Sequence, residues 1–265
     1  MKNLALEIEN TLVPDGSAAL WWLAQAGFAF KCSDETVIYL DPYLSDAVEA
    51  LFGFKRLSLA PICAEEVRAD WVISSHEHLD HLDADALPVI ARNNPGCLFA
   101  GPEPCRAVYE SCGIDESRQV MMAPGGAYDL GGARAYAARA DHGKLSPSAL
   151  ALVLDFGEVR VMFSGDTALR LEWLQPLIDL QPDVLIACIN GAFGNLDAGE
   201  AARLAAVVKP RLVIPCHFWM FKEHGGDPES FVQACGEQCP RVQVRLLSPG
   251  EGVLVTQESA VRIGQ

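Results

Sequence analysis

The sequence predicts an α/β fold organised as one domain over residues 1–265. Half of the residues are apolar and 21% are charged, so the chain can bury a sizeable core. The last third alternates helical segments with short apolar strands, and the middle third has the pattern of β-hairpins. No linker, low-complexity tract or charge block interrupts the chain. One domain with two α/β halves is therefore the simplest interpretation.

The expected elements follow one another along the whole chain. We expect strands or strand pairs within residues 19–32, 36–44, 70–76, 97–102, 127–142, 148–167, 182–190, 210–218 and 242–248. We expect helices within residues 83–94, 104–113, 170–181, 197–209 and 227–238. Pro95 and Gly96 are expected to end the first of these helices, and Phe156–Gly157 marks the turn of the second hairpin.

Charge and cysteine content limit the partners and the compartment. The formal net charge of −15 disfavours a long nucleic acid or an anionic membrane as partner. The nine cysteines form no CxxC pair, which favours free and mostly buried thiols in a reducing cytoplasm. The first residues lack the pattern of a signal peptide, and the apolar run from Ala18 to Phe30 is too short to cross a bilayer.

Several apolar strands end on polar residues. The segments "ADWVISSH", "PDVLIACIN" and "PRLVIPCHF" have His76, Asn190 and His217 at or next to their ends, and these residue types bind metals or substrates. Open α/β sheets place their sites at the carboxyl ends of such strands. We therefore expect these residues to meet at one edge of the core.

A cluster of histidines follows the first of these strands. The segment "SHEHLDH" holds three of the six histidines of the chain, and His76, His78 and Asp80 would point to one side of an extended segment. Imidazole and carboxylate groups suit Zn, Mn or Fe. Together with His81 they are too many for one closed site without cysteine, so they suggest two metals. A polar loop that caps the next helix is the alternative interpretation.

Three further strand ends offer ligands for a two-metal site. His142 follows the strand in "ARAYAARADH", Asp166 lies in "FSGDT", and His217 ends "VIPCH". A carboxylate such as Asp166 can bridge two cations about 3.5–4 Å apart. Each residue alone could instead be a helix cap or a buried structural residue.

These motifs resemble the metallo-β-lactamase superfamily in order and spacing across nearly the whole chain. The resemblance implies a four-layer αββα sandwich with a dinuclear metal site at one edge. It further implies that one metal is bound by His76, His78 and His142. The other would be bound by Asp80, His81 and His217, with Asp166 as the bridge.

A narrower resemblance concerns the segments "LWWLAQAGFAFK", "IYLDPYLSD", "INGAFGNLDAGEAARLA" and "VIPCHFWMF". They are similar to the L-ascorbate-6-phosphate lactonase group, which implies a sugar-acid lactone as substrate and suggests homo-oligomers. A water between two divalent ions would supply hydroxide for attack on the carbonyl. Asp80 or Asp166 would accept and relay its proton.

Other polar residues near these motifs are weaker candidates. Asp41 could orient a ligand histidine or the loop at His76, with simple turn capping as the alternative, and Asn190 could line the site. Lys222 and His224 could contact an anionic substrate, although a solvated loop is the simpler interpretation. Asn195 is expected to cap the helix that follows it.

The leading functional hypothesis is a hydrolase with two divalent ions, with Zn and Mn as the first candidates and Fe as a further one. Its expected substrate is a small molecule, and an anionic one is a candidate. A phosphodiesterase on cyclic nucleotides or other small phosphodiesters is the first alternative, because the same metals activate water toward phosphorus. A metal-binding scaffold without catalysis is the second.

Overall fold

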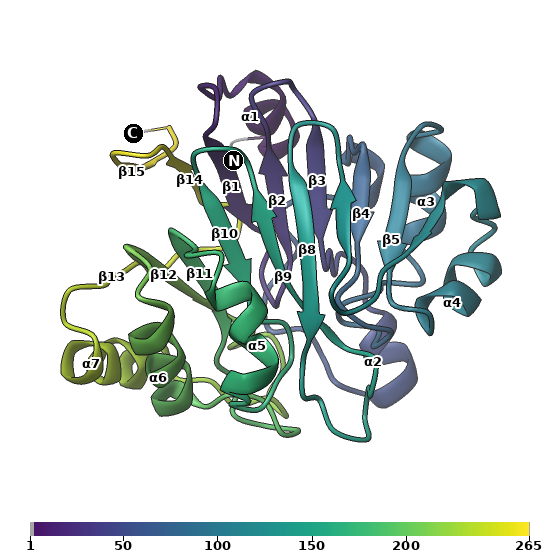
Figure 1. The fold of residues 1–265 in the computed structure, drawn as a ribbon. Helices are drawn as coiled ribbons and strands as arrows, with labels where there is room; N and C mark the ends of the chain where they lie inside the picture. The colour runs from purple at the N-terminus through teal and green to yellow at the C-terminus, as the bar shows by residue number, and fades with distance from the viewer. Residues whose placement is uncertain (1–2, 265) are drawn as a thin grey trace.

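Two β-sheets pack face to face, and helices cover the outer side of each sheet (Figure 1). The computed structural model describes residues 3–264. This arrangement is the four-layer αββα sandwich that the sequence resemblance implied.

The first sheet has eight strands. Its order is β15 (Ala260–Arg262), β14 (Gly252–Val255), β1 (Ala18–Trp22), β2 (Phe28–Lys31), β3 (Val37–Leu40), β4 (Trp71–Ile73), β5 (Leu98–Gly101) and β6 (Gln119–Met121). The strands from β15 to β3 are antiparallel, and those from β3 to β6 are parallel.

The second sheet has seven strands and the same mixed character. Its order is β13 (Gln243–Val244), β12 (Leu212–Cys216), β11 (Val184–Cys188), β10 (Arg160–Phe163), β9 (Leu150–Asp155), β8 (Arg134–Arg139) and β7 (Ala127–Asp129). Strands β7 to β10 are antiparallel and β10 to β13 are parallel. The parallel strands of each sheet end at a common edge, which is where a site is expected.

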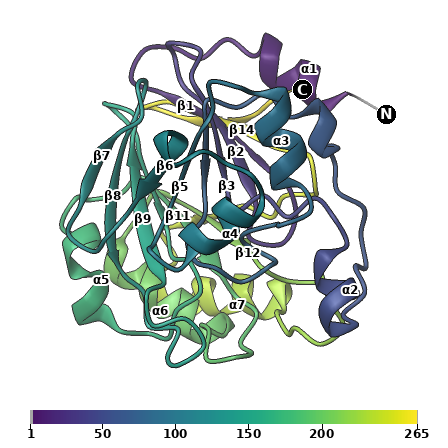
Figure 2. The ribbon, with the colours of Figure 1, turned by 90° about the vertical axis from the view of Figure 1, so that its right-hand side faces the viewer.

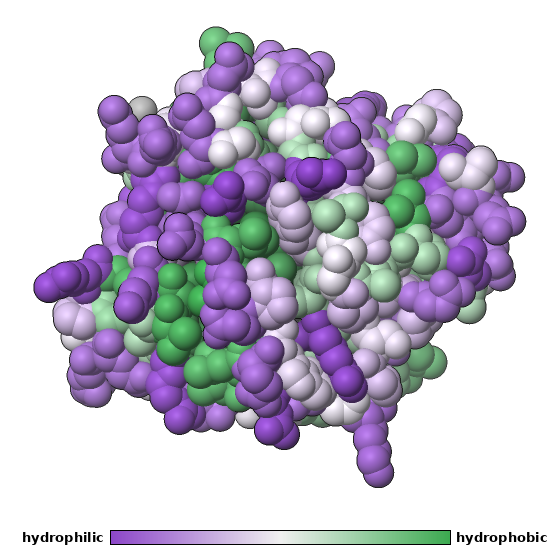
Figure 3. Space-filling model, viewed as in Figure 1, coloured by the Kyte–Doolittle hydropathy of each residue, from purple (hydrophilic) through white to green (hydrophobic). Residues whose placement is uncertain are grey.

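The helices form the two outer layers. Their bounds are α1 (Leu4–Asn10), α2 (Ala47–Phe52), α3 (Leu87–Asn93), α4 (Cys105–Ser111), α5 (Leu171–Ile178), α6 (Ala198–Val208) and α7 (Pro228–Gln238), with short 3₁₀ turns η1 (Ala64–Glu66) and η2 (Glu116–Arg118). Figure 2 shows α3 and α4 over the first sheet, and Figure 1 shows α5, α6 and α7 beside the second. Most of the face in Figure 3 is hydrophilic, with a hydrophobic area near α5 and α6.

Successive side chains of a strand point to opposite faces of the sheet, so the first sheet contributes to two separate parts of the core. On β1, Leu20 and Trp22 face the space between the sheets, whereas Ala19 and Trp21 face α1 and α3. All four side chains are buried, so the first sheet is apolar on both faces. Burial of this kind explains why the segment has no alternation of apolar and polar residues.

Several elements differ from the sequence expectation. Helix α3 begins at Leu87 rather than at residue 83, because the Asp83 carboxylate accepts hydrogen bonds from the amides of Leu44 and Ser45 and holds a turn there. Pro88 in the first helical turn fits that later start. The expected strand at 242–248 shortens to β13. Helices α1 and α2 and strands β6, β14 and β15 were not expected.

Two other sequence expectations bear on the compartment. None of the helices within residues 3–264 is long and apolar enough to span a bilayer. All nine cysteines are free, and seven of them are buried, as predicted.

Candidate metal centre

The seven predicted ligands converge at one edge of the two sheets. They come from the loop after β4 and from the chain just beyond β8, β10 and β12, and they are His76, His78, Asp80, His81, His142, Asp166 and His217. Gly165 makes the turn before Asp166 with a φ of 60°, and a Cβ there would lie 2.5 Å from the Leu150 carbonyl oxygen. Only glycine therefore fits this turn.

The loop after β4 is a series of bends and turns, so the expected extended conformation is wrong. The amides of His81 and Leu82 both donate to the carbonyl of His78. The start of the loop is fixed because Asp41 accepts hydrogen bonds from both the amide and the hydroxyl of Ser75, each at 2.6 Å. The turn brings His76 and His78 together by folding the chain rather than by strand alternation.

Three histidines form the first group of candidate ligands. The Nε2 atom of His76 lies 2.9 Å from Nδ1 of His78, and Nε2 of His142 lies 3.3 Å from that same Nδ1 atom. His76 and His142 are buried, and His78 is partly exposed. Three imidazole nitrogens that face one point offer the donor set of a divalent transition metal.

Asp80, His81 and His217 form the second group. The Nε2 atoms of His81 and His217 are 3.3 Å apart, and they lie 3.6 and 3.5 Å from Oδ2 of Asp80. The chain adopts a left-handed conformation at His217, with a φ of 60°. Such a strained residue is typical of functional sites, because the surrounding structure must maintain it.

Asp166 lies between the two groups. Its Oδ2 atom is 3.7 Å from Nε2 of His142, and its Oδ1 atom is 3.5 and 3.4 Å from Nε2 of His81 and His217. Oδ1 is buried and has no hydrogen-bond partner among the described residues. A cation on each side would satisfy both oxygens, so the residues present fit a bridged pair of metal ions.

The carboxylates and histidines of the cluster shift one another's pKa values. Burial raises the pKa of the Asp80 and Asp166 carboxyls, but His81 and His217 outweigh burial and bring both values well below the ordinary range. Burial lowers the pKa of His217, but Asp166 and Asp80 outweigh it and raise the value to about 10. Protons on these histidines therefore balance the carboxylates, a role that divalent cations can take over.

Asp41 contacts His81, a member of the second group. Its carboxylate is fully buried, and its Oδ2 atom accepts a hydrogen bond at 2.7 Å from Nδ1 of His81. This contact fixes the imidazole so that Nε2 faces Asp80 and Asp166. The contact places Asp41 where it could orient His81, and this role stays a prediction.

Sequence reasoning missed two residues of the site. The amide of Gln25 is buried and donates to Oδ2 of Asp80 at 2.7 Å, and the amide of Asn195 donates to Oδ2 of Asp166 at 2.6 Å. The expected cap role of Asn195 is wrong, because Asp197 caps α6 in a capping box with Glu200. A buried glutamine inside the apolar run 18–30 was the one available signal for Gln25.

The weaker candidates divide into two kinds. Asn190 and His224 line a cavity of about 350 Å³ next to the ligand cluster, and the ring of His224 stacks on that of His217 with centroids 5.1 Å apart. Burial and the neighbouring His217 lower the pKa of His224 to about 4, so its imidazole is neutral. Lys222 is exposed and does not line this cavity.

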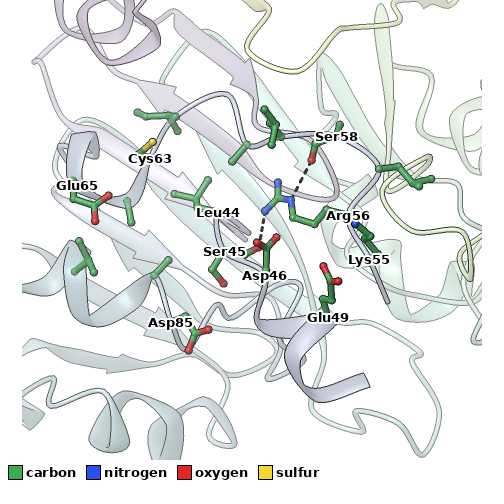
Figure 4. A pocket seen from close by; sticks show the side chains of 17 residues that line it. Leu44, Ser45, Asp46, Glu49, Lys55, Arg56, Ser58, Cys63, Glu65 and Asp85 are labelled. Carbon is green, nitrogen blue, oxygen red and sulfur yellow. Dashed lines mark hydrogen bonds between the residues drawn. The ribbon is translucent and has the colours of Figure 1, made fainter. Parts of the chain in front are cut away.

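A second cavity of about 650 Å³ lies on the other side of α2, and no candidate metal ligand lines it. Figure 4 shows Arg56 in its wall between Ser45 and Ser58, donating to both carbonyls at 2.8 and 3.2 Å. Arg56 also donates to the carbonyl of Tyr43. It therefore ties the segment before α2 to the segment after it.

The chain belongs to the beta-lactamase superfamily, among its metal-dependent hydrolases. Residues 19–217 match the family model of the beta-lactamase superfamily domain. The match includes all seven candidate ligands, from His76 to His217.

Relatives and solved structures agree with this assignment. A UPF0173 metal-dependent hydrolase of Aeropyrum pernix is 30% identical over 255 residues, which cover 88% of this chain and 96% of that protein. A UPF0173 metal-dependent hydrolase of Archaeoglobus fulgidus is 29% identical over 244 residues, covering 87% and 96%. The fold is similar to that of Igni18, a metallo hydrolase of Ignicoccus hospitalis, with a TM-score of 0.69, 23% identity and coverage of 91% and 99%.

Proposed function

We propose that the protein is a dinuclear metal-dependent hydrolase that opens a small lactone. The position of Asp166 between two groups of candidate ligands is the observation that carries the proposal. Zn or Mn suits the imidazole and carboxylate donors, and Fe is a further candidate. The sequence similarity to the L-ascorbate-6-phosphate lactonase group supports a lactone as the substrate class.

The chain supplies positioning and proton transfer. Bound divalent ions would acidify water and polarise the carbonyl of the lactone. Asp80 lines the cavity and is partly exposed, so its carboxylate is placed to accept the proton of the attacking water. Gln25 holds Asp80 in place, and Asn195 holds Asp166. Asn190 and His224 face the cavity, where they can bind polar atoms of the substrate.

Metal analysis and a substrate panel test this proposal. We expect close to two ions per chain, and fewer than half an ion would contradict a dinuclear site. Lactones and small phosphodiesters are assayed with Zn or Mn on the parent and on Asp166→Ala. The control is Asp183→Ala, because Asp183 lies at the start of β11, away from the ligands. Full activity of Asp166→Ala on the best substrate would refute the mechanism. A protein that binds metal without catalysis would hydrolyse none of the substrates in the panel.

The compartment and the assembly are parts of the same proposal. Free thiols, including Cys188 and Cys216 with sulfurs 3.7 Å apart, support a reducing environment such as the cytoplasm. We further propose a homo-oligomer, on the lactonase similarity alone. Light scattering of the purified protein measures the oligomeric state directly.

A further inference from the structure

The cavity beside the candidate metal ligands has a largely apolar wall. Six aliphatic or aromatic side chains line it, namely Val48, Phe52, Phe54, Leu79, Leu145 and Phe193. They come from α2, from the loop after β4 and from loops that follow α2, β8 and β11. Separate parts of the chain thus present apolar groups to one space of about 350 Å³.

The aromatic members of the wall form a continuous path that starts at a candidate ligand. The ring of His224 stacks on His217 and contacts Phe193 at 5.2 Å and Phe54 at 6.2 Å between centroids. Phe52 extends the path, with its ring 6.2 Å from that of Phe54. A substrate with its carbonyl at the metal cluster would therefore place its remaining atoms against aromatic faces.

Three residues of this wall are exposed although they are large and apolar. Phe52, Leu145 and Phe193 have exposed fractions of 59%, 52% and 49%. Phe193 also has a φ of 57°, a left-handed conformation that is rare and strained for a phenylalanine. Neither exposure nor strain favours folding, so both indicate that the wall serves to bind a ligand.

The charge of the cavity excludes one class of ligand. Within residues 3–264, no lysine or arginine lines it, whereas Glu77, Asp80 and Asp166 do. Lys55 lies in the wall of the other cavity. An anionic substituent such as a phosphate would find carboxylates and phenyl rings beyond the metal ions and no cationic side chain.

We propose that the substrate is a lactone with an uncharged aliphatic or aryl substituent, which packs against this aromatic wall. The inference rests on the proposed lactonase function and replaces a charged or sugar substituent by an apolar one. In the reaction, water adds to the carbonyl carbon and the ring C–O bond breaks. The products are a hydroxycarboxylate and one proton, and no further reactant is needed.

The test compares three lactones on the metal-loaded protein: γ-butyrolactone, γ-nonalactone, which adds a pentyl chain, and 6-phosphogluconolactone. We expect kcat/KM for γ-nonalactone to exceed that for each of the other two at least tenfold. The double variant Phe52→Ala, Phe193→Ala should lose about tenfold on γ-nonalactone, mainly through KM. Its loss on γ-butyrolactone, which has no chain to contact the wall, should be much smaller. Both side chains are exposed, so the fold should tolerate the change. Leu59→Ala is the control, because Leu59 is 89% exposed and lines the other cavity.

A binding measurement separates this inference from the proposed function. Nonanohydroxamic acid and acetohydroxamic acid are titrated calorimetrically into the metal-loaded parent and the double variant. The longer chain should bind the parent at least tenfold more tightly, and the double variant should lose this difference. That binding result supports the apolar wall whether or not a lactone is hydrolysed. A failure to hydrolyse any lactone would refute only the proposed lactonase activity. Equal affinities, a preference for the phosphorylated lactone, or an equal loss in Leu59→Ala would overturn the inference.

Discussion

Replacing Asp41 by asparagine tests whether this carboxylate sets the protonation of His81. Oδ2 of Asp41 accepts the Nδ1 proton of His81 at 2.7 Å, so the proton on Nε2 is the one that a metal ion would displace, and the Nε2 lone pair would bind the metal. In Asp41→Asn the side chain keeps an oxygen for the Ser75 amide but presents an NH₂ group to Nδ1. The imidazole must then carry its proton on Nε2, the atom that faces Asp80 and Asp166.

The expected magnitude follows from what is lost. Removing an orienting partner of a ligand histidine typically weakens metal binding by about 10–100-fold, which equals about 1.4–2.8 kcal/mol. Loss of the charge-assisted hydrogen bond should lower the free energy of unfolding of the metal-free protein by about 1.5–3 kcal/mol. Competition with a chromophoric chelator measures the first quantity, and denaturant unfolding measures the second.

Asp83→Asn is the matched control. Asp83 is also a buried carboxylate that accepts hydrogen bonds from a serine amide and hydroxyl, those of Ser45, but it touches no histidine. We expect a comparable loss of stability with unchanged metal affinity. The reasoning about His81 is refuted if Asp41→Asn binds metal as tightly as the parent, or if both variants lose affinity equally.

Three further predictions concern other parts of the structure. The pKa of His217 is raised to about 10, so its protonated form stabilises the folded, metal-free protein. This contribution is complete below about pH 6.5 and is lost as the pH rises through about 10. The melting temperature of chelator-treated protein should therefore fall across this window, and His217→Gln should flatten the decline; an identical decline in the variant would contradict the assignment. Asn195→Ala removes the hydrogen bond to Oδ2 of Asp166 and should lower kcat about 10–100-fold, while the circular dichroism spectrum is retained. An unchanged kcat would show that Asp166 does not need this hydrogen bond. Arg56→Met should lower the free energy of unfolding by about 1–3 kcal/mol, since three backbone carbonyls lose their donor, and a thermal melt equal to that of the parent would disprove this role.

The order of the elements and the candidate ligands could be predicted because each carries a strong local signal. Buried strands such as β11 and β12 are uninterrupted apolar runs that stop on Asn190 and His217. The helix expected within residues 197–209 is α6, and Asp197 and Glu200 have the spacing of a capping box at its start, although the cap was expected at Asn195. Such signals depend on neighbours in the chain, so the sequence alone carries them.

The contacts that complete the site could not be predicted, because they join distant parts of the chain. Gln25 reaches Asp80 across 55 positions, and nothing near Gln25 in the sequence indicates this. Asn195 resembles a helix cap by its position, and its contact with Asp166 depends on how two loops pack. Gln25 and His217 also adopt left-handed φ values that their residue types disfavour, so tertiary structure overrides local preference there.

The candidate ligands come from both halves of the sandwich. His76 to His81 follow a strand of the first sheet, whereas His142, Asp166 and His217 follow strands of the second. Ions bound by both sets would join the two sheets, and the concentration of free metal would set how strongly they do so. At a hundred times the dissociation constant one ion adds about 2.7 kcal/mol to the folded state. Chelation should therefore weaken the contact between the two sheets as well as stop hydrolysis, which links the durability of the protein to the metal supply of its surroundings.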